Sequence, residues 1–274
     1  MELHAQEGLL TTSPSGTAPP RVLVATAVPV ERDAVARAFD GTPSRVPLPA
    51  ATLARLLPHP GGAEYDLLAA GVGPGLAAAS TAGALTAAAL RGTPYDLVVS
   101  AGIGGGFLPD APPASLVLAE EITAADLGAE TDGAGGPGAD GTPGFLPVTD
   151  LGFGTVTHLP PAALVRRAAE ATGARTGTVL TVSTVTGTAR RAAELRARHP
   201  RALAEAMEGF GVAEAAAAHR TPVLEIRAVS NPVGPRDRAA WRIGDALAAL
   251  TVAFGKLAPV LESWNPHDDR TDRD

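Results

Sequence analysis

Two carboxylates and one carboxamide lie where a sheet would present them to a ligand. Glu31 follows the apolar run 21–27, Asn231 follows the run 222–229, and Glu208 lies in an alanine-rich stretch. Open α/β sheets bind ligands at the carboxyl ends of their strands. A carboxylate there can act as a general base, and an amide there can hydrogen-bond a ligand in the crevice. These three residues are therefore candidates for chemistry.

Each of the three also has a purely structural interpretation. Glu31 would place a favourable charge in a first helical turn, Glu208 would be an exposed helix residue, and Asn231 would form a turn before Pro232. Two glycines follow closely on Glu208, and glycine inside a helix costs ~1 kcal/mol relative to alanine. That cost favours close packing or a ligand nearby, but the pattern alone leaves both interpretations open.

Glycine clusters at 71–75 and 102–106 directly follow two strand-like runs. They predict either tight turns with positive φ or backbone amides that cradle a ligand. A dinucleotide site is disfavoured after the first cluster, because Ser100 and Ala101 stand where an acid should hold the ribose. It is disfavoured after the second because three prolines prevent a crossover helix. We expect no cofactor.

Composition excludes several classes of protein. The net charge of −7 and the pI of about 5.4 argue against a nucleic-acid partner. There is no cysteine, so disulfides, thiolate metal sites and a cysteine nucleophile are excluded. None of the six histidines pairs at metal-ligand spacing, and we expect no metal. Lys256 is the only lysine, which disfavours Schiff-base chemistry.

The termini and one internal tract differ in composition from the rest. We expect residues 1–20 to be a disordered leader, 131–147 a flexible Gly/Pro loop within a domain spanning 21–264, and 265–274 a disordered tail. The first residues lack the features of a secretory signal. No apolar run reaches the ~18 residues of a membrane span. We therefore expect a cytoplasmic protein with no membrane partner.

Strand and helix signals alternate along the chain, which predicts a single three-layer α/β domain. Buried strands are expected at 21–27, 65–70, 96–101, 115–121, 178–184 and 222–229. Helices are expected at 30–39, 76–91, 161–172, 189–198, 202–219 and 238–263.

Five short motifs occur in an order and spacing that carry a resemblance. They are Ala27-x-x-x-Glu31, Gly71-x-Gly73, Ala101-Gly-Ile-Gly-Gly-Gly, Ala206-Met-Glu208-Gly and Arg227-Ala-Val-Ser-Asn231. Over residues 21–264 the chain resembles the purine nucleoside phosphorylase/methylthioadenosine nucleosidase superfamily. Within it, the segments ATAVPVERDAV, VSTVTGT and SNPVGPRDR are most similar to the futalosine hydrolase family, the nucleosidases of the futalosine route to menaquinone.

The resemblance implies a nucleoside phosphorylase-like fold, with a central mixed, largely twisted sheet flanked by helices. It implies an N-glycosyl hydrolase that cleaves futalosine into hypoxanthine and dehypoxanthine futalosine. The small-molecule partner would be this nucleoside, and the enzyme would be a homo-oligomer, a dimer or larger.

The resemblance also implies roles for individual residues. Glu31 matches the carboxylate that positions and deprotonates the attacking water. Glu208 matches the glutamate that grips the ribose 2′- and 3′-hydroxyls, and Met207 would pack under the sugar. The loop beside the ribose and base would consist of Ile103, Gly104 and Gly105.

Asn231 stands where adenine-cleaving relatives carry an aspartate. A 6-oxopurine presents acceptors at both N7 and O6, and a side-chain amide can donate two hydrogen bonds whereas a carboxylate only accepts. A mismatched hydrogen-bond pattern can reject a substrate by ~10⁴–10⁵. Asn231 therefore predicts hypoxanthine or guanine as the leaving base, stabilised as charge builds on it.

The remaining site residues are implied on the same basis. Val185 stands where adenine-specific relatives often stack a phenylalanine on the base, so the base must be contacted in another way. Trp241 stands where relatives place an aromatic side chain over the 5′ substituent. Futalosine ends in a carboxyphenyl group, and Arg236 or Arg238 could pair with its carboxylate.

Hydrolysis is favoured over phosphorolysis, because a carboxylate at position 31 would repel phosphate. Two alternatives stay open from the residues alone. One is a 6-oxopurine nucleoside phosphorylase, and the other is a non-catalytic module that binds nucleosides.

Overall fold

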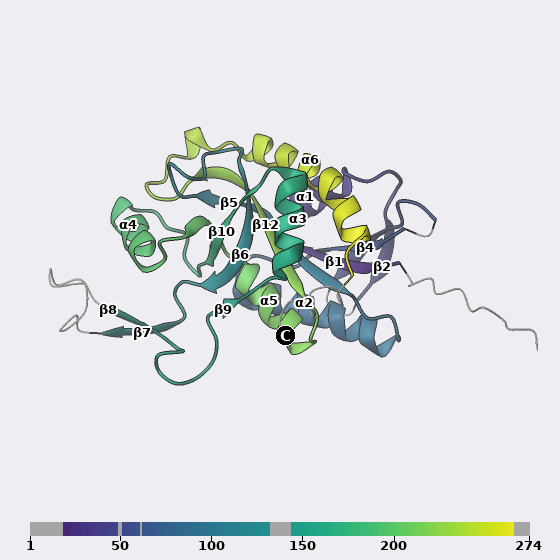
Figure 1. Cartoon of the computed structure of the whole chain (residues 1–274), viewed down its shortest axis with the longest axis horizontal. Helices are drawn as coiled ribbons and strands as arrows, with labels where there is room; N and C mark the ends of the chain where they lie inside the picture. Colours follow the sequence, from purple (N-terminus) through teal and green to yellow (C-terminus); the bar gives the residue numbers. More distant parts are fainter. Residues whose placement is uncertain (1–18, 49–50, 61, 132–143, 266–274) are drawn as a thin grey trace, which may run out of the picture.

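A ten-stranded mixed sheet forms the centre of the molecule (Figure 1). The computed structural model describes residues 19–48, 51–60, 62–131 and 144–265. The sheet contains β1 (Arg21–Thr26), β2 (Ser44–Pro47), β3 (Thr52–Leu56), β4 (Glu64–Ala69), β5 (Leu97–Gly106), β6 (Leu116–Ala124), β9 (Thr157–His158), β10 (Arg175–Thr181), β11 (Ala202–Ala206) and β12 (Val223–Pro232). The helices are α1 (Pro29–Ala36), α2 (Pro74–Leu90), α3 (Ala162–Thr172), α4 (Ala189–Arg198), α5 (Gly209–Ala218) and α6 (Ile243–Glu262).

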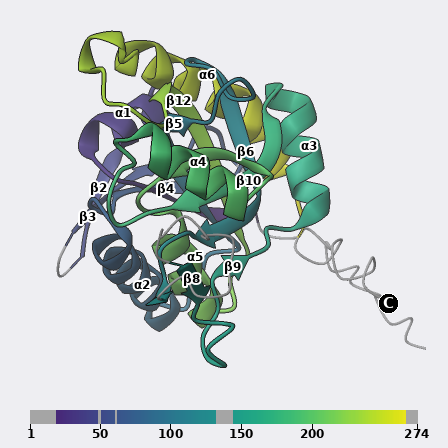
Figure 2. The ribbon, with the colours of Figure 1, turned by 90° about the vertical axis from the view of Figure 1, so that its left-hand side faces the viewer.

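Helices cover both faces of this sheet, which confirms the three-layer α/β fold. Buried residues of α1, α3 and α6 join one apolar core with the strands, and those of α2 and α5 join the other. The side view shows α1 and α6 toward the top and α2 and α5 toward the bottom, with α3 at the right (Figure 2). Parallel pairs such as β1–β4 and antiparallel pairs such as β6–β12 occur together, so the sheet is mixed as expected.

One half of the sheet curls into a closed ring. The strand order is β11-β10-β6-β12-β5-β1-β4-β3-β2, and β11 also pairs with β5 in antiparallel fashion. Strands β5 and β12 each have ten residues and run side by side almost to their ends. Because β11 runs antiparallel to β5, the chain that follows β11 passes along the middle of β5, where Gly102 pairs with Arg227.

The second glycine cluster is strand, so the prediction that β5 ends at 101 is wrong. Its glycines allow backbone to approach backbone. A Cβ on Gly104 would lie 2.8 Å from the Glu205 carbonyl oxygen, and one on Gly106 would lie 2.0 Å from that of Ala111. The first cluster is a turn, as one of the two interpretations predicted, with φ of +100° at Gly71 and +89° at Gly73.

The prediction of one helix over 202–219 is also wrong. The first five residues form β11, and α5 begins only at Gly209. Every residue of β11 is buried, and its alanine-rich composition carries no period that distinguishes strand from helix. The prediction of a helix over 238–263 is corrected in a smaller way. A single 3₁₀ turn at Arg238–Ala240 precedes α6.

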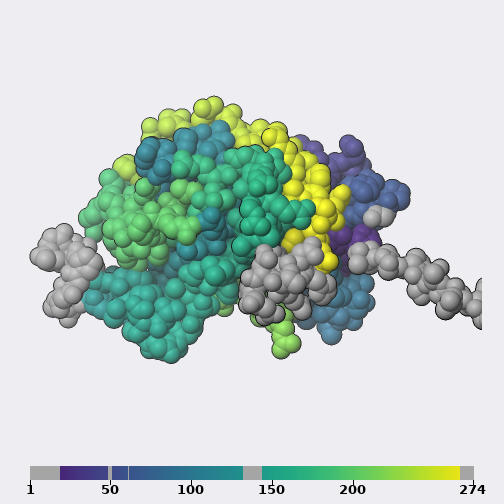
Figure 3. Space-filling view, viewed as in Figure 1, coloured from purple at the N-terminus to yellow at the C-terminus, as the bar shows by residue number. Residues whose placement is uncertain are grey.

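The expected loop at 131–147 contains strand at both of its ends. Strand β7 (Gly128–Thr131) pairs with β8 (Gly144–Pro147) as a separate two-stranded sheet. In the space-filling view the teal segment around β8 forms a lobe at the lower left (Figure 3). The stretch 132–143 lies outside the described residues, as do 1–18 of the expected leader and 266–274 of the expected tail. The domain limits therefore stay a prediction.

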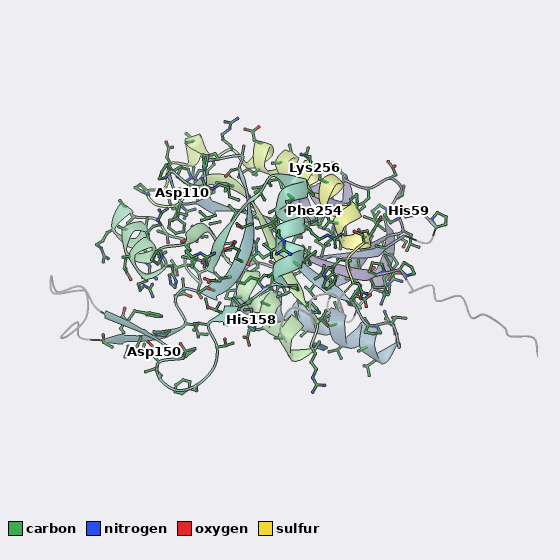
Figure 4. All side chains as sticks on the ribbon, viewed as in Figure 1. His59, Asp110, Asp150, His158, Phe254 and Lys256 are labelled. Atoms are coloured by element: carbon green, nitrogen blue, oxygen red, sulfur yellow. The ribbon has the colours of Figure 1, made fainter. Side chains whose placement is uncertain are left out.

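Helix α6 combines great length with an apolar composition. With the 3₁₀ turn, Arg238–Glu262 could cross a membrane by length and composition, a test that core helices of soluble proteins also pass. Its inner face includes Leu250, Phe254 and Leu257, which are fully buried in the core, while Lys256 is exposed (Figure 4). We therefore interpret α6 as a core helix.

Close packing of α5 on α2 gives a prediction about Gly211. A Cβ there would lie 2.1 Å from the Pro74 carbonyl oxygen, so Gly211→Ala must push the two helices apart. We expect a loss of about 1–3 kcal/mol in the free energy of unfolding, measured by urea denaturation. Gly255→Ala in α6 is the control, because nothing lies within 4 Å of its Cβ position, and it should not destabilise. Equal midpoints for the two variants would contradict this account.

Candidate active site

Glu31 lies in the first turn of α1, directly beyond the carboxyl end of β1. Its side chain is only 3 % exposed. One carboxylate oxygen accepts the N–H groups of Ala27 (2.9 Å) and Val28 (3.2 Å). The other oxygen accepts the N–H of Ile103 on β5 (2.9 Å). Glu31 thus caps its own helix, as the structural interpretation predicted, and also reaches across to the glycine-rich end of β5.

The surroundings of Glu31 shift the pKa of its carboxyl group in two opposite directions. Burial raises the pKa of Glu31 above its usual range. The N–H donors of Ile103 and Val28 and the nearby Arg227 lower the pKa, and Glu208 raises it again. The net result is a raised pKa on a carboxylate that still has three N–H donors for its ionised form.

Glu208 is buried in the connection between β11 and α5, so the interpretation as an exposed helix residue is wrong. It is 6 % exposed. Its Oε1 accepts the N–H of Gly73 (3.2 Å), and its Oε2 accepts the N–H of Met207 (3.3 Å). Both are long bonds, and Met207 itself is half-buried. The backbone N–H of Gly73, in the first glycine cluster, therefore donates to a side-chain carboxylate of the protein.

Arg227 connects the two carboxylates and was assigned no role from the sequence. It lies on β12 and is fully buried. Its Nη1 lies 3.5 Å from Glu208 Oε2, its Nη2 donates to Ser100 Oγ (2.9 Å), and its Nε donates to Glu225 (2.8 Å). The signal available in the sequence was an arginine two residues after a glutamate inside a strand of buried residues, since a buried charge must find a partner.

Gly102 makes the approach of Glu31 and Arg227 possible. A Cβ at this position would lie 2.7 Å from Glu31 Oε1 and 2.7 Å from Arg227 Nη1, so both groups occupy the space that a side chain would fill. Burial alone would lower the pKa of Arg227, but Glu225, Glu208 and Glu31 together hold it above its usual range. The guanidinium therefore stays charged.

Asn231 lies near the end of β12, beside the end of β5. A Cβ on Gly105 would lie 3.5 Å from Asn231 Nδ2. Ser230 Oγ lies 2.8 Å from Asn231 Oδ1, and Nδ2 donates to the Pro232 carbonyl oxygen (2.9 Å). The sequence predicts that the side-chain amide of Asn231 offers two free N–H donors. That expectation is corrected, because one of the two N–H groups already donates to Pro232. Residues Ile103, Gly104 and Gly105 are strand rather than loop, because β5 continues to Gly106.

Val185 is exposed in the segment that follows β10. Next to it, Thr186 is buried and donates both its N–H (2.8 Å) and its hydroxyl to the carboxylate of Glu205 on β11. Burial raises the pKa of Glu205, and these two bonds lower it. The segment is thus tied to β11, three residues before Glu208.

The residues expected at the 5′ end of a substrate lie between β12 and α6. Trp241 is half-buried, and the guanidinium of Arg236 lies 5.4 Å from the centre of its ring, in a cation–π contact. Arg238 is exposed at the start of the 3₁₀ turn. Arg242, directly after Trp241, donates its N–H to the Ser230 carbonyl oxygen (2.8 Å). Because Arg242 follows Trp241 and Ser230 precedes Asn231, this bond holds Trp241 close to Asn231 in space.

Among the described residues, the histidines that form hydrogen bonds or ion pairs do so outside this group of residues. His158 on β9 bonds Glu214 of α5 (2.6 Å), and His219 bonds Thr86 of α2 (3.0 Å). Figure 4 shows His158 at the lower edge of the sheet, next to α5. Within the described ranges, no group of three or more His, Asp or Glu side chains could hold a metal ion.

The structure thus brings Glu31 and Glu208 together at Arg227 and Gly102, and it places Asn231 beside Gly105, three residues further along β5. The family model of the phosphorylase superfamily matches residues 21–262 of this chain.

More specific similarities come from individual relatives. The chain is 76 % identical to the futalosine hydrolase of Streptomyces coelicolor, over 90 % of this chain and 99 % of the relative. It is 40 % identical to that of Acidothermus cellulolyticus, over 86 % of this chain and 89 % of the relative. A solved structure, the futalosine hydrolase of Helicobacter pylori, superposes with a TM-score of 0.68 at 16 % identity, over 88 % and 97 % of the two chains. The chain belongs to the phosphorylase superfamily and, within it, to the futalosine hydrolase family.

The contact between Thr186 and Glu205 gives a prediction with a defined pH dependence. A buried acid with a raised pKa destabilises the fold once it ionises, and the Thr186 hydroxyl offsets part of that cost. Thr186→Val should lower the free energy of unfolding by about 1–3 kcal/mol at neutral pH. The penalty should shrink as pH falls through the folded-state pKa of Glu205. Denaturant titrations at several pH values measure it.

The matched control is Thr184→Val, an exposed threonine in the same segment. It should leave stability unchanged at every pH. A Thr186→Val penalty that is equal at neutral and acidic pH would show that Glu205 does not titrate as described.

Proposed function

We propose that this chain hydrolyses the N-glycosidic bond of futalosine, releasing hypoxanthine and dehypoxanthine futalosine in menaquinone biosynthesis. The observation that carries the proposal is the pairing of the buried carboxylates of Glu31 and Glu208 around Arg227 on β12, with Asn231 four residues further along the same strand. The names of the closely similar relatives support the substrate.

Glu208 is the group that binds the ribose in this proposal. Its carboxylate accepts two long N–H bonds and lies 3.5 Å from a guanidinium nitrogen. These contacts leave acceptor positions of the carboxylate unoccupied. The vicinal hydroxyls of a ribose can therefore donate to it. Met207, half-buried on the adjacent residue, is available to pack against the sugar.

Glu31 is the proposed general base. A carboxylate has about four acceptor positions, and three of those of Glu31 are taken by backbone N–H groups. The remaining position can hold a water molecule for attack on C1′. The same three N–H bonds fix the carboxylate in place, so little reorganisation is needed when the proton moves.

Asn231 is the proposed recognition group for the purine. Its one uncommitted N–H can be shared between N7 and O6 of hypoxanthine, which are both acceptors. An amide does not protonate the base. It stabilises negative charge on the departing purine as a preorganised donor.

Trp241 and Arg236 are the proposed partners of the 5′ carboxyphenyl group. The aryl ring can stack on the indole, and the guanidinium already lies over that ring. A carboxylate arriving there would find Arg236 exposed and able to pair with it, with Arg238 as the alternative. Cytoplasmic location and a homo-oligomeric state stay predictions that rest on the sequence and the resemblance.

The test of the function is product analysis in phosphate-free buffer. Futalosine should be converted to free hypoxanthine, and added phosphate should not be required. Glu31→Gln should lower kcat by about 10²–10⁴, because the general base is lost. Since Glu31 must be ionised and its pKa is raised, wild-type kcat/KM should fall as pH is lowered through a value above 4.5.

Glu170→Gln, an exposed carboxylate on α3, is the matched control and should behave as wild type. Strict dependence on phosphate would identify a 6-oxopurine nucleoside phosphorylase instead. Binding without turnover, unchanged by Glu31→Gln, would identify a non-catalytic nucleoside-binding module.

Replacing the amide at position 231 tests the choice of base. Asn231→Asp should reduce kcat/KM for futalosine by about 10²–10³, because a donor becomes an acceptor. The rate on methylthioadenosine relative to futalosine should rise. Asn231→Ala is the control, since it removes the donor without adding an acceptor and should lower both rates. Equal futalosine cleavage by wild type and Asn231→Asp would refute this role.

A further inference from the structure

Glu225 is a fully buried carboxyl group that the mechanism above does not use. It lies on β12 two residues before Arg227, so the two side chains share one face of the strand. Its Oε1 accepts the Nε–H of Arg227 at 2.8 Å. Its Oε2 has no hydrogen-bond partner among the residues that the structure describes.

Gly209 leaves room for this carboxyl group. A Cβ on Gly209 would lie 2.2 Å from Glu225 Oε2 and 2.3 Å from Oε1. Gly209 is the first residue of α5 and directly follows Glu208. Glu225 is thus packed beneath the connection that carries the proposed ribose-binding carboxylate.

The charges around Arg227 do not balance. Three carboxyl groups, those of Glu31, Glu208 and Glu225, face a single guanidinium. If all three were ionised, the buried cluster would hold an excess of two negative charges, which is costly away from water.

The three carboxyl groups differ in how well their ionised forms are supported. Glu31 accepts three backbone N–H bonds, and Glu208 accepts two besides its contact with Arg227. Glu225 accepts only the Nε–H of Arg227. It therefore gains least from ionisation and is the group that best tolerates a proton.

We propose that Glu225 is a positioning residue that carries a proton and orients Arg227 toward Glu31 and Glu208. The proposal rests on the function proposed above. Oε1 accepts from Nε and turns the two Nη groups of Arg227 toward Glu208 and Ser100, and the proton resides on Oε2. Because Glu225 is uncharged, the positive charge of Arg227 offsets only the negative charges of Glu31 and Glu208, the two carboxylates that must stay ionised.

The surroundings of Glu225 agree with this assignment. Burial raises the pKa of Glu225, Arg227 lowers it, and Glu208 raises it again. The neighbouring position on β5 is the neutral Ser100, and α5 contributes Gly209, which has no side chain.

Two variants separate positioning from charge. Glu225→Gln mimics the protonated acid, because its amide oxygen can still accept from Arg227 and its NH₂ replaces the O–H. We expect kcat and the acidic limb of the kcat/KM–pH profile for futalosine to match wild type. Glu225→Leu removes the acceptor and releases the guanidinium. We expect kcat to fall about 10²-fold, as for a catalytic group that is misplaced by about 1 Å.

Infrared spectroscopy reads the proton without turnover. The difference spectrum between wild type and Glu225→Gln at neutral pH should show the carbonyl stretch of a protonated carboxyl group in wild type only. This measurement, together with the pH profile of Glu225→Gln, decides the proposal even where Glu225→Leu does not fold.

Defined results would overturn the proposal. A displacement of the acidic limb to lower pH in Glu225→Gln, or no protonated carboxyl signal in wild type, would mean that Glu225 is ionised. Wild-type turnover by Glu225→Leu would mean that it does not position Arg227. Failure of the proposed function is a separate outcome, visible as absent hypoxanthine release by wild type while the infrared signal persists.

Discussion

The burial of the Arg227 guanidinium is the constraint on which the arrangement of the site depends. A charge held away from water requires partners at short range. Glu225, Ser100 and Glu208 supply them from a strand, a neighbouring strand and a helix connection. Those partners fit only because positions 102 and 209 are glycine, since a Cβ at either would collide with the charged groups. At these two positions glycine provides space for charged groups rather than freedom for a turn.

Closure of the sheet is the second requirement. In the linear order of strands, β11 is separated from β1 by β10, β6, β12 and β5. Glu208 follows β11 and Glu31 follows β1, so a flat sheet would hold the two acids far apart. The additional pairing of β11 with β5 removes that separation. The glycine at 104 permits it, because a Cβ there would lie 2.8 Å from the Glu205 carbonyl oxygen on β11. The same glycine-rich segment thus serves the topology and the electrostatics together.

Much of this molecule could be predicted from its sequence, and the errors have physical causes. The six expected strands exist, all but β5 close to their expected bounds, and so do five of six helices, because short apolar runs bounded by turn residues indicate buried strands and a helical period indicates helices. Strand β11 was missed since Ala202–Ala206 is buried on all sides and shows no period. The extension of β5 was missed because a glycine run is typical of turns. Asn231 and Glu31 could be found because strand ends attract ligands. Arg227 and Glu225 could not be assigned roles, because alternation in a strand does not reveal which buried charges face one another.

The hydrogen bonds that Asn231 makes within the protein fix which end of its side-chain amide a proposed ligand would meet. Ser230 has one hydroxyl proton and two acceptors within reach, the Gly104 carbonyl oxygen at 3.2 Å and Asn231 Oδ1 at 2.8 Å. The shorter contact directs the proton to Oδ1, so the amide oxygen accepts from Ser230 and Nδ2 donates to the Pro232 carbonyl oxygen. An aspartate at this position would offer Ser230 the same acceptor but would have a second acceptor in place of the Nδ2 donor. In the proposed role of Asn231, the choice of 6-oxopurine over adenine would therefore depend on Ser230 as well, because a freely rotating amide could present either of its ends.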